Sequence, residues 1–302
     1  MARRRKCLGI TLGILIVMAI SIWTGNNRLS VSRYEVAVDG LDPAFDGLRV
    51  VQISDLHGKF FGKDQGRLAG KAARLSPDII LCTGDMVDSR RYREEPVYAL
   101  IEKLTDIAPV YMTSGNHEWW TAGKYQEMIP RLEALGAAVL ENQTAAIERD
   151  GAHLWIIGVS DEDCIAAQAY YGTQEGTVSP GEPLREAATG DTPDYMETVL
   201  PGLLEGRDAP ALVLSHRPEY FPLYAAYGAD VVFSGHAHGG QIRIPFVGGL
   251  VAPGQGAFPH YDSGLYREGD TGMVVSRGLG NSLFPVRILN PPDIVLVTLR
   301  SE

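Results

Sequence analysis

Cysteine is scarce in this chain, with three among 302 residues. Cys7 lies in an apolar run near the N-terminus, Cys82 inside a second apolar run and Cys164 in a polar stretch. Three scattered thiols exclude a disulfide framework and a CxxC metal site. Internal repeats and low-complexity tracts are absent as well, so the sequence gives no sign of a repeat architecture.

Positive charge is also scarce outside the N-terminus. The net charge is −10 at pH 7 with histidine neutral, and this total already includes the four basic residues of segment 3–6. An acidic protein repels nucleic acid and anionic membrane surfaces. We therefore expect no nucleic-acid partner, and we expect bound cations to neutralise several of the carboxylates.

One long uncharged run, from Cys7 to Thr24, follows the basic residues. As a helix it would cover about 27 Å of a hydrocarbon core about 30 Å thick. We interpret residues 1–25 as a basic region and a transmembrane signal-anchor of a single-pass cell-membrane protein, with the rest of the chain outside the cytoplasm. The alternatives are a cleaved secretory signal, a twin-arginine export signal and a buried core helix. No A-x-A cleavage site follows the run, which favours the anchor.

Residues 34–302 are long enough for one large domain, and 45% of the whole chain is hydrophobic. Strand-like runs alternate with helical patterns in the first half, which predicts an α/β fold, and the second half is richer in strands. The predicted strands include residues 48–53, 79–82, 109–112, 211–214 and 231–234. Residues 161–207 are rich in Gly, Pro, Ala and acidic residues, which predicts either a substrate-facing lid or a disordered loop.

Polar side chains follow several of these strands at the point where each strand ends. A single histidine in such a place is usually a core residue, but five of the seven histidines in the chain share it. Because the carboxyl ends of parallel strands meet at one edge of a sheet, we expect these side chains to gather there. They are Asp55, His57, Asp85, Asn116, His117, His216, His236 and His238.

Without His117, this set comprises two carboxylates, one amide and four imidazoles. Seven ligands are too many for one ion and suit a pair of divalent ions that share a carboxylate. Mixed nitrogen and oxygen donors favour Mn, Fe, Co or Zn over Ca. The sequence therefore predicts two divalent metal ions, whose identity stays open.

The order of these motifs resembles the signature of the calcineurin-like metallophosphoesterase superfamily. The motifs are Asp55-Leu56-His57, Gly84-Asp85-Met86-Val87-Asp88, Gly115-Asn116-His117-Glu118, His216 and Gly235-His236-Ala237-His238. The likeness extends over residues 48–240, and the N-terminal run with segments 239–243 and 276–280 further resembles the bacterial membrane-associated branch. It implies a four-layer sandwich, in which two mixed β-sheets lie face to face with helices outside.

The resemblance also implies roles for individual residues. Asp55, His57 and His238 would bind one metal ion, while Asn116, His216 and His236 would bind the other. Asp85 would bridge the two ions. His117 would protonate the leaving oxygen, and Asp88 would orient His117 unless it only caps a turn.

Two positions depart from better-known relatives. Asp88 stands where purple acid phosphatases carry a tyrosinate, and Ser89 stands where Ser/Thr protein phosphatases of the superfamily carry a phosphate-binding arginine. Arg90, Arg217 and Arg243 are the candidates to replace that arginine. An iron-tyrosinate site is therefore not expected, and a phosphoprotein substrate is disfavoured.

We therefore expect a metal-dependent phosphoesterase that hydrolyses a phosphodiester or pyrophosphate bond. Its substrate would be lipid-linked, derived from the cell envelope, or a small phosphodiester. The alternatives are a non-catalytic scaffold with the same fold and a metal-free interaction protein tethered by the N-terminal segment. The complete set of seven ligands disfavours both alternatives.

Overall fold

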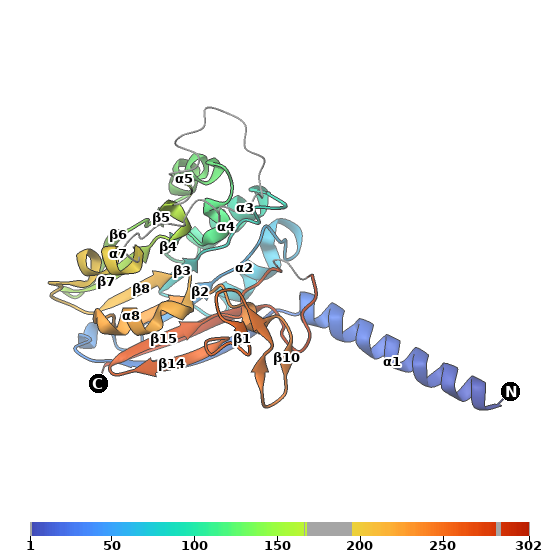
Figure 1. Ribbon diagram of the computed structural model, residues 1–302. Helices are drawn as coiled ribbons and strands as arrows, with labels where there is room; N and C mark the ends of the chain where they lie inside the picture. Colours follow the sequence, from blue (N-terminus) through green and yellow to red (C-terminus); the bar gives the residue numbers. More distant parts are fainter. Residues whose placement is uncertain (1, 166, 168–194, 282–284, 302) are drawn as a thin grey trace.

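A computed structural model describes residues 2–165, 167, 195–281 and 285–301 of the chain. Two six-stranded sheets lie face to face, and helices cover their outer faces (Figure 1). The predicted α/β architecture, with two mixed sheets between helices, is confirmed.

The first sheet has the strand order β1-β16-β2-β3-β4-β5. Its strands are β1 (Ser30–Val38), β16 (Asp293–Ser301), β2 (Arg49–Ile53), β3 (Ile79–Thr83), β4 (Val110–Thr113) and β5 (Ala137–Val139). Strands β2 to β5 are parallel, whereas β16 runs antiparallel to β2. The helices on its outer face are α2 (Gly66–Ala73), α3 (Glu95–Thr105) and α5 (Lys124–Ala134). The parallel strands therefore end at one edge of this sheet.

The second sheet has the strand order β14-β15-β9-β8-β7-β6. Its strands are β14 (Gly264–Glu268), β15 (Thr271–Val275), β9 (Val231–Ser234), β8 (Ala211–Ser215), β7 (Ala152–Val159) and β6 (Gln143–Arg149). The four central strands are parallel, and the two outer ones are antiparallel to their neighbours. The helices α7 (Tyr195–Leu204) and α8 (Phe221–Ala226) pack on its outer face.

Alternating side chains of the central strands fill the spaces between the layers. In β2, Val50 packs between the two sheets, whereas Val51 packs under the helices of the first sheet. In β9, Phe233 packs between the sheets and Val232 packs under α7 and α8. Both faces of these strands are buried, which is why their sequences are continuous apolar runs rather than alternating patterns.

Short elements carry the loops around this core. They are α4 (Asn116–Trp119), the 3₁₀ turns η1 (Pro43–Phe45), η2 (Lys63–Gln65), η4 (Pro218–Tyr220) and η5 (His238–Gly240), and the strands β10 (Arg243–Ile244), β11 (Gly248–Gly249), β12 (Val251–Ala252) and β13 (Gly256–Ala257). The last four form two small hairpins directly after His238.

The N-terminal segment forms a helix, α1 (Ala2–Asn27), that leaves the body of the molecule (Figure 1). Its last turn packs so closely on Arg287 that a Cβ on Gly25 would lie 2.1 Å from the Arg287 carbonyl oxygen. No helix in the described ranges combines the length and the apolar character that crossing a membrane requires. The transmembrane segment predicted for residues 1–25 is therefore not supported by the structure.

One strand differs from its predicted bounds, and one predicted region lies mostly outside the described residues. The first strand begins at Ser30, four residues ahead of the predicted strand from Tyr34 to Val38. Residues 168–194, most of the predicted lid or disordered loop, lie outside the described residues. The part of 161–207 that is described includes α7, whose Leu200 is fully buried against the second sheet.

Candidate metal centre

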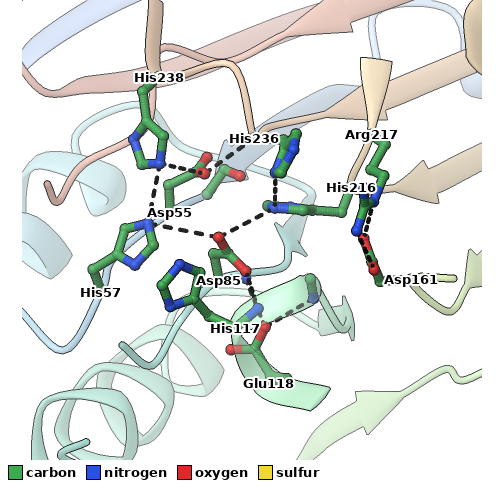
Figure 2. A network of polar contacts seen from close by, with 12 residues as sticks. Asp55, His57, Asp85, His117, Glu118, Asp161, His216, Arg217, His236 and His238 are labelled. Atoms are coloured by element: carbon green, nitrogen blue, oxygen red, sulfur yellow. Dashed lines mark hydrogen bonds and ion pairs between the residues drawn. The ribbon is translucent and has the colours of Figure 1, made fainter. Parts of the chain in front are cut away.

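The ends of β2, β3, β4, β8 and β9 converge at one place between the sheets, and the predicted site residues gather there (Figure 2). All of them are buried, the most exposed being His57 at 8%. The residues brought together are Asp55, His57, Asp85, His117, His216, His236 and His238, and the buried Asn116 directly precedes His117 at the start of α4. Residues up to 183 positions apart in the sequence thus share one buried cluster.

Five of the seven predicted ligands have a left-handed backbone. Their φ angles are 51° at Asp55, 48° at His57, 52° at Asp85, 63° at His236 and 50° at His238. A residue with a side chain adopts this conformation rarely, at a cost of order 1 to 3 kcal/mol each. Such strain persists where the surrounding structure enforces it, and here it turns each side chain from its strand end into the cluster.

Four of the side chains form a first group. The Nε2 atoms of His57 and His238 lie 3.1 Å apart. The His57 Nε2 atom is 3.6 Å from Asp85 Oδ2, and the His238 Nε2 atom is 3.4 Å from Asp55 Oδ1. One ligand atom from each of the four residues lies within 4.8 Å of the others, a spacing that fits a single metal ion.

A second group shares Asp85 with the first. His216 Nε2 is 3.3 Å from Asp85 Oδ2 and 3.2 Å from His236 Nδ1. Asn116 stands at the start of α4, and its Oδ1 atom is buried without a hydrogen-bond partner among the described residues. The buried Oδ2 atom of Asp55 lacks one as well. Orphaned acceptors are costly in a protein interior, and a cation would satisfy both.

The electrostatics of the cluster also fit divalent cations. Burial lowers the pKa of His57, His236 and His238 well below the usual range, so these rings are neutral and can donate a lone pair. Burial disfavours charge on His216 too, but the charge and hydrogen bond of Asp85, together with the charges of Asp55 and Asp161, outweigh it and raise the pKa of His216 to about 10. In the absence of metal, His216 therefore carries a proton beside the ionised Asp85. A divalent ion would replace it there, and the donor set fits such a group.

His117 lies beside this cluster and is oriented by Ser89. The backbone N–H of Ser89 donates to His117 Nδ1 at 3.1 Å, so a neutral ring carries its proton on Nε2. Asp88 approaches the same Nδ1 only to 3.8 Å and accepts the backbone N–H of Arg90 at 2.9 Å. The geometry thus favours the turn cap for Asp88, and it gives the orienting contact to a neighbour that sequence reasoning did not assign.

Two of the three predicted phosphate-binding arginines, Arg217 and Arg243, form ion pairs with carboxylates. Arg217 makes two bonds to Asp161, at 2.7 and 2.9 Å, and also pairs with the next two carboxylates along the chain (Figure 2). Arg243 pairs with Asp262 at 3.0 Å. The first pairs hold the loop after β7, and the second joins β10 to the loop before β14. Neither guanidinium is therefore free to bind phosphate without breaking an ion pair.

Glu118 is a site residue whose role the sequence did not reveal. Its buried carboxylate accepts four backbone N–H groups at 2.7 to 3.0 Å. The donors are Asp85, Met86, Val87 and Gly115. Glu118 therefore ties the loop after β3 to the loop after β4 and fixes the backbone of Asp85.

Replacing Glu118 by glutamine tests this role. The amide NH₂ would face backbone N–H groups that need acceptors, and a buried donor left unsatisfied costs about 1 to 3 kcal/mol. We expect Glu118→Gln to lower the free energy of unfolding by about that amount in a urea titration and to weaken metal binding. The exposed Glu133→Gln on α5 is the matched control, and a Glu118→Gln protein as stable as this control would contradict the role.

Arg287 is a second site residue whose role the sequence did not reveal, and it lies outside the family motifs. It is fully buried, and it donates to the carbonyl oxygens of Gly280 at 2.6 Å and Arg277 at 2.8 Å. Its Nη2 atom is also 3.4 Å from His238 Nδ1. Although burial lowers the pKa of Arg287 to about 10, the group is still charged near neutral pH. The Arg287 charge thus lies behind the His238 ring, whose Nε2 faces the cluster, and adds to burial in lowering the pKa of His238. Its one sequence signal is that it is the single charge between residues 278 and 292.

A lysine at position 287 would keep the charge and lose the planar set of donors. Contacts behind metal ligands typically contribute 10- to 100-fold to metal affinity. We expect a loss in that range for Arg287→Lys, measured by competition with a chelating dye. Arg300→Lys, which changes an exposed arginine paired with Glu35, is the control. Equal affinity in both variants would show that Arg287 does not support the centre.

Comparisons with known proteins agree with this centre. The profile of the family described as "Calcineurin-like phosphoesterase" matches residues 48–240. An uncharacterized metallophosphoesterase of Bacillus subtilis, YkuE, is 29% identical over 265 residues, which cover 85% of this chain and 80% of that protein.

Two relatives carry names that state an activity. One is the phosphodiesterase YaeI of Escherichia coli, 26% identical over 74% of this chain and 70% of that protein. The other is the UDP-2,3-diacylglucosamine pyrophosphatase LpxG of Chlamydia trachomatis, 25% identical over 96% of this chain and 97% of that protein. With a matching family profile over most of its length and a buried Asp/His centre suited to metal, the chain belongs to the calcineurin-like phosphoesterases, which are metal-dependent hydrolases of phosphoester bonds.

Proposed function

We propose that this chain hydrolyses phosphodiester or pyrophosphate bonds with two divalent metal ions. The observation that carries the proposal is the position of Asp85, whose Oδ2 atom lies 3.6 Å from His57 Nε2 and 3.3 Å from His216 Nε2. One carboxylate therefore belongs to both groups of ligands. This is the arrangement that a bridged pair of ions requires.

The ligands divide as the family resemblance implies. Asp55, His57 and His238 would hold one ion, Asn116, His216 and His236 the other, and Asp85 both. When bound, such ions supply Lewis-acid polarisation of phosphoryl oxygens and lower the pKa of water. Mn, Fe, Co and Zn suit the mixed donors.

The protein's own groups prepare this site for reaction. The imidazole of His216 is fixed because its Nδ1–H donates to the Thr83 carbonyl oxygen at 2.7 Å, which leaves Nε2 toward Asp85. His117, held by Ser89 at Nδ1, presents an Nε2–H that would deliver a proton to the leaving oxygen.

A phosphodiester or pyrophosphate fits better than a phosphoprotein. Ser89 replaces the arginine that would bind a phosphomonoester, and Arg217 and Arg243 are held in ion pairs. A diester or pyrophosphate needs less compensating charge at the scissile phosphorus than a dianionic monoester. The relatives named as a phosphodiesterase and as a pyrophosphatase of a diacylated sugar nucleotide support this class and a lipid-linked substrate.

The location of the chain at the cell membrane, outside the cytoplasm, stays a prediction from the sequence. It rests on the basic residues 3–6 ahead of the uncharged run from Cys7 to Thr24. Cell fractionation followed by carbonate extraction, with the mature N-terminus sequenced, tests it.

Metal content tests the bridge and separates the enzyme from a non-catalytic scaffold. We expect metal removal to abolish hydrolysis of bis(p-nitrophenyl) phosphate and Mn, Co or Zn to restore it. Asp85→Ala should lose both ions because it contacts both groups, whereas His57→Ala should keep the ion of the second group. Inductively coupled plasma mass spectrometry measures the metal content of both variants. Equal metal content in the two variants would refute the bridge, and a metal-loaded wild type without turnover would favour the scaffold.

His117→Asn separates proton delivery from metal binding. Removing a general acid typically costs about 10² to 10⁴ in rate, and the cost shrinks when the leaving group departs without protonation. We expect His117→Asn to keep its metal, to lose that much activity on alkyl diesters and to lose far less on activated aryl diesters. Asp88→Asn is the matched control and should be nearly neutral on both substrates. A uniform rate loss or a loss of metal in His117→Asn would contradict the acid role.

A further inference from the structure

The small hairpins after His238 display an apolar surface that the phosphoesterase site does not use. We define the apolar rim as Ile244, Phe246, Val247, Phe258 and Leu289, whose side chains are exposed by 39%, 109%, 60%, 61% and 57%. Ile244, Phe246, Val247 and Leu289 line one surface groove together with Pro259. The other walls of this groove include His260, Tyr266 and the ion pair of Arg243 and Asp262. Large apolar side chains gathered on one exposed surface mark an interaction site.

The backbone of the rim adds a second, independent observation. Phe246, Phe258 and Leu289 have φ angles of 67°, 54° and 52°. Glycine or asparagine is favoured in this conformation, and a bulky side chain is a rare exception that costs stability. These three positions thus carry residues that are unfavourable both for the local backbone and for contact with water. Folding does not explain them, so their benefit comes from what the rim contacts.

The charge of the segment that carries most of the rim indicates what the rim contacts. Residues 244–261 contain no Asp, Glu, Lys or Arg, although 21% of the chain is charged. Protein interfaces surround their apolar centre with polar, solvent-accessible residues, and arginine is enriched in them. An uncharged segment with aromatic residues at its turns suits the boundary between lipid headgroups and acyl chains, where no charge has to be desolvated. We propose that the apolar rim inserts into the surface of a lipid bilayer.

The rim is joined directly to the metal centre. Leu250 donates its backbone N–H to the Gly240 carbonyl oxygen at 3.1 Å, two residues after His238. Asn290, next to Leu289, donates to the His238 carbonyl oxygen at 2.7 Å. A rim seated in the headgroup layer therefore brings the His238 loop to the level at which lipid phosphates lie. This consequence for a lipid-linked phosphoester rests on the proposed function, whereas insertion of the rim does not.

The position of α1 agrees with this placement. The helix joins the body where its Gly25 packs on the backbone of Arg287, two residues before Leu289. Figure 1 shows the β10 hairpin and α1 both projecting from the body beyond the sheets. On α1, Leu12, Ile16 and Ile20 are 58%, 50% and 57% exposed and share one face at a spacing of four residues.

The acidic composition of the chain specifies the kind of bilayer. With a net charge of −10, the protein gains nothing from anionic headgroups. The rim itself is uncharged, so its insertion depends on apolar transfer alone. Phosphatidylcholine vesicles should therefore bind at least as well as vesicles that contain phosphatidylglycerol.

Fluorescence quenching in the full-length protein tests the insertion at the rim itself, apart from any binding by α1. Phe246→Trp adds a reporter at the rim, and Ile165→Trp adds one at an exposed apolar position elsewhere, 46% exposed in the native protein. With vesicles of acyl-brominated phosphatidylcholine, we expect the added fluorescence of Phe246→Trp to be quenched and that of Ile165→Trp to be unaffected. Unquenched Phe246→Trp on a chain that floats with the vesicles would overturn the proposal.

A loss-of-binding variant completes the test. Asparagine tolerates the left-handed backbone, so the triple variant Phe246→Asn, Phe258→Asn, Leu289→Asn should keep the thermal midpoint and metal content of the native protein. Full burial of one such side chain corresponds to about tenfold or more in partitioning, and we expect the triple variant to bind phosphatidylcholine vesicles at least about tenfold more weakly. Retained vesicle binding by the triple variant, together with unquenched Phe246→Trp, would show that α1 alone binds the vesicles and would overturn the role of the rim. If instead the native chain dimerises without lipid, the triple variant is monomeric and no quenching occurs, the rim is a contact between two copies and the lipid proposal is wrong.

Discussion

The structure around the metal centre depends on burying carboxylates next to one another. Asp55, Asp85 and Glu118 are fully or almost fully buried and lie within one cluster. Burial raises the pKa of Asp55 to about 6, which measures how unfavourable this charge is without a counter-ion. The imidazoles compensate for it only in part, because burial keeps three of them neutral and His216 alone is charged. Divalent cations would supply the missing positive charge.

Much of this arrangement could be predicted because it is periodic and local. Buried strands such as Val231–Ser234 are continuous apolar runs, and polar residues mark the point where each run ends. Since parallel strands end at the same edge, Asp55, Asp85 and His216 could be placed together from their position after a strand alone. The structure brings all seven predicted ligands together, while the role of each ligand remains a prediction that metal analysis can test. The sequence was less informative about the N-terminal run, because apolar length alone does not distinguish a membrane span from other helices.

The contacts that hold the ligands could not be predicted, because they depend on backbone groups and on distant segments. Glu118 is in a recognisable motif, yet its four partners are amide N–H groups of two loops. Ser89 reaches His117 Nδ1 with both its backbone N–H and its hydroxyl, a contact that depends on the turn after β3 and that the residue type alone did not indicate. Arg287 lies 49 residues after His238 and contacts it only because the C-terminal strand β16 returns to the middle of the first sheet. A pattern of residue types records none of these geometries.

The linkage between the rim and the centre has a mechanical consequence. Arg287 lies behind the His238 ring and Asn290 donates to the His238 carbonyl oxygen, and both residues lie within two positions of the exposed Leu289. A force on the rim from an inserting bilayer would therefore reach a metal ligand through two hydrogen-bonded residues rather than through a flexible loop. Glycines make the contact close: a Cβ on Gly240 would lie 2.3 Å from the Cα atom of Gly249. Because packed backbones transmit displacement with little loss, a surface built in this way can couple docking to the geometry of the centre.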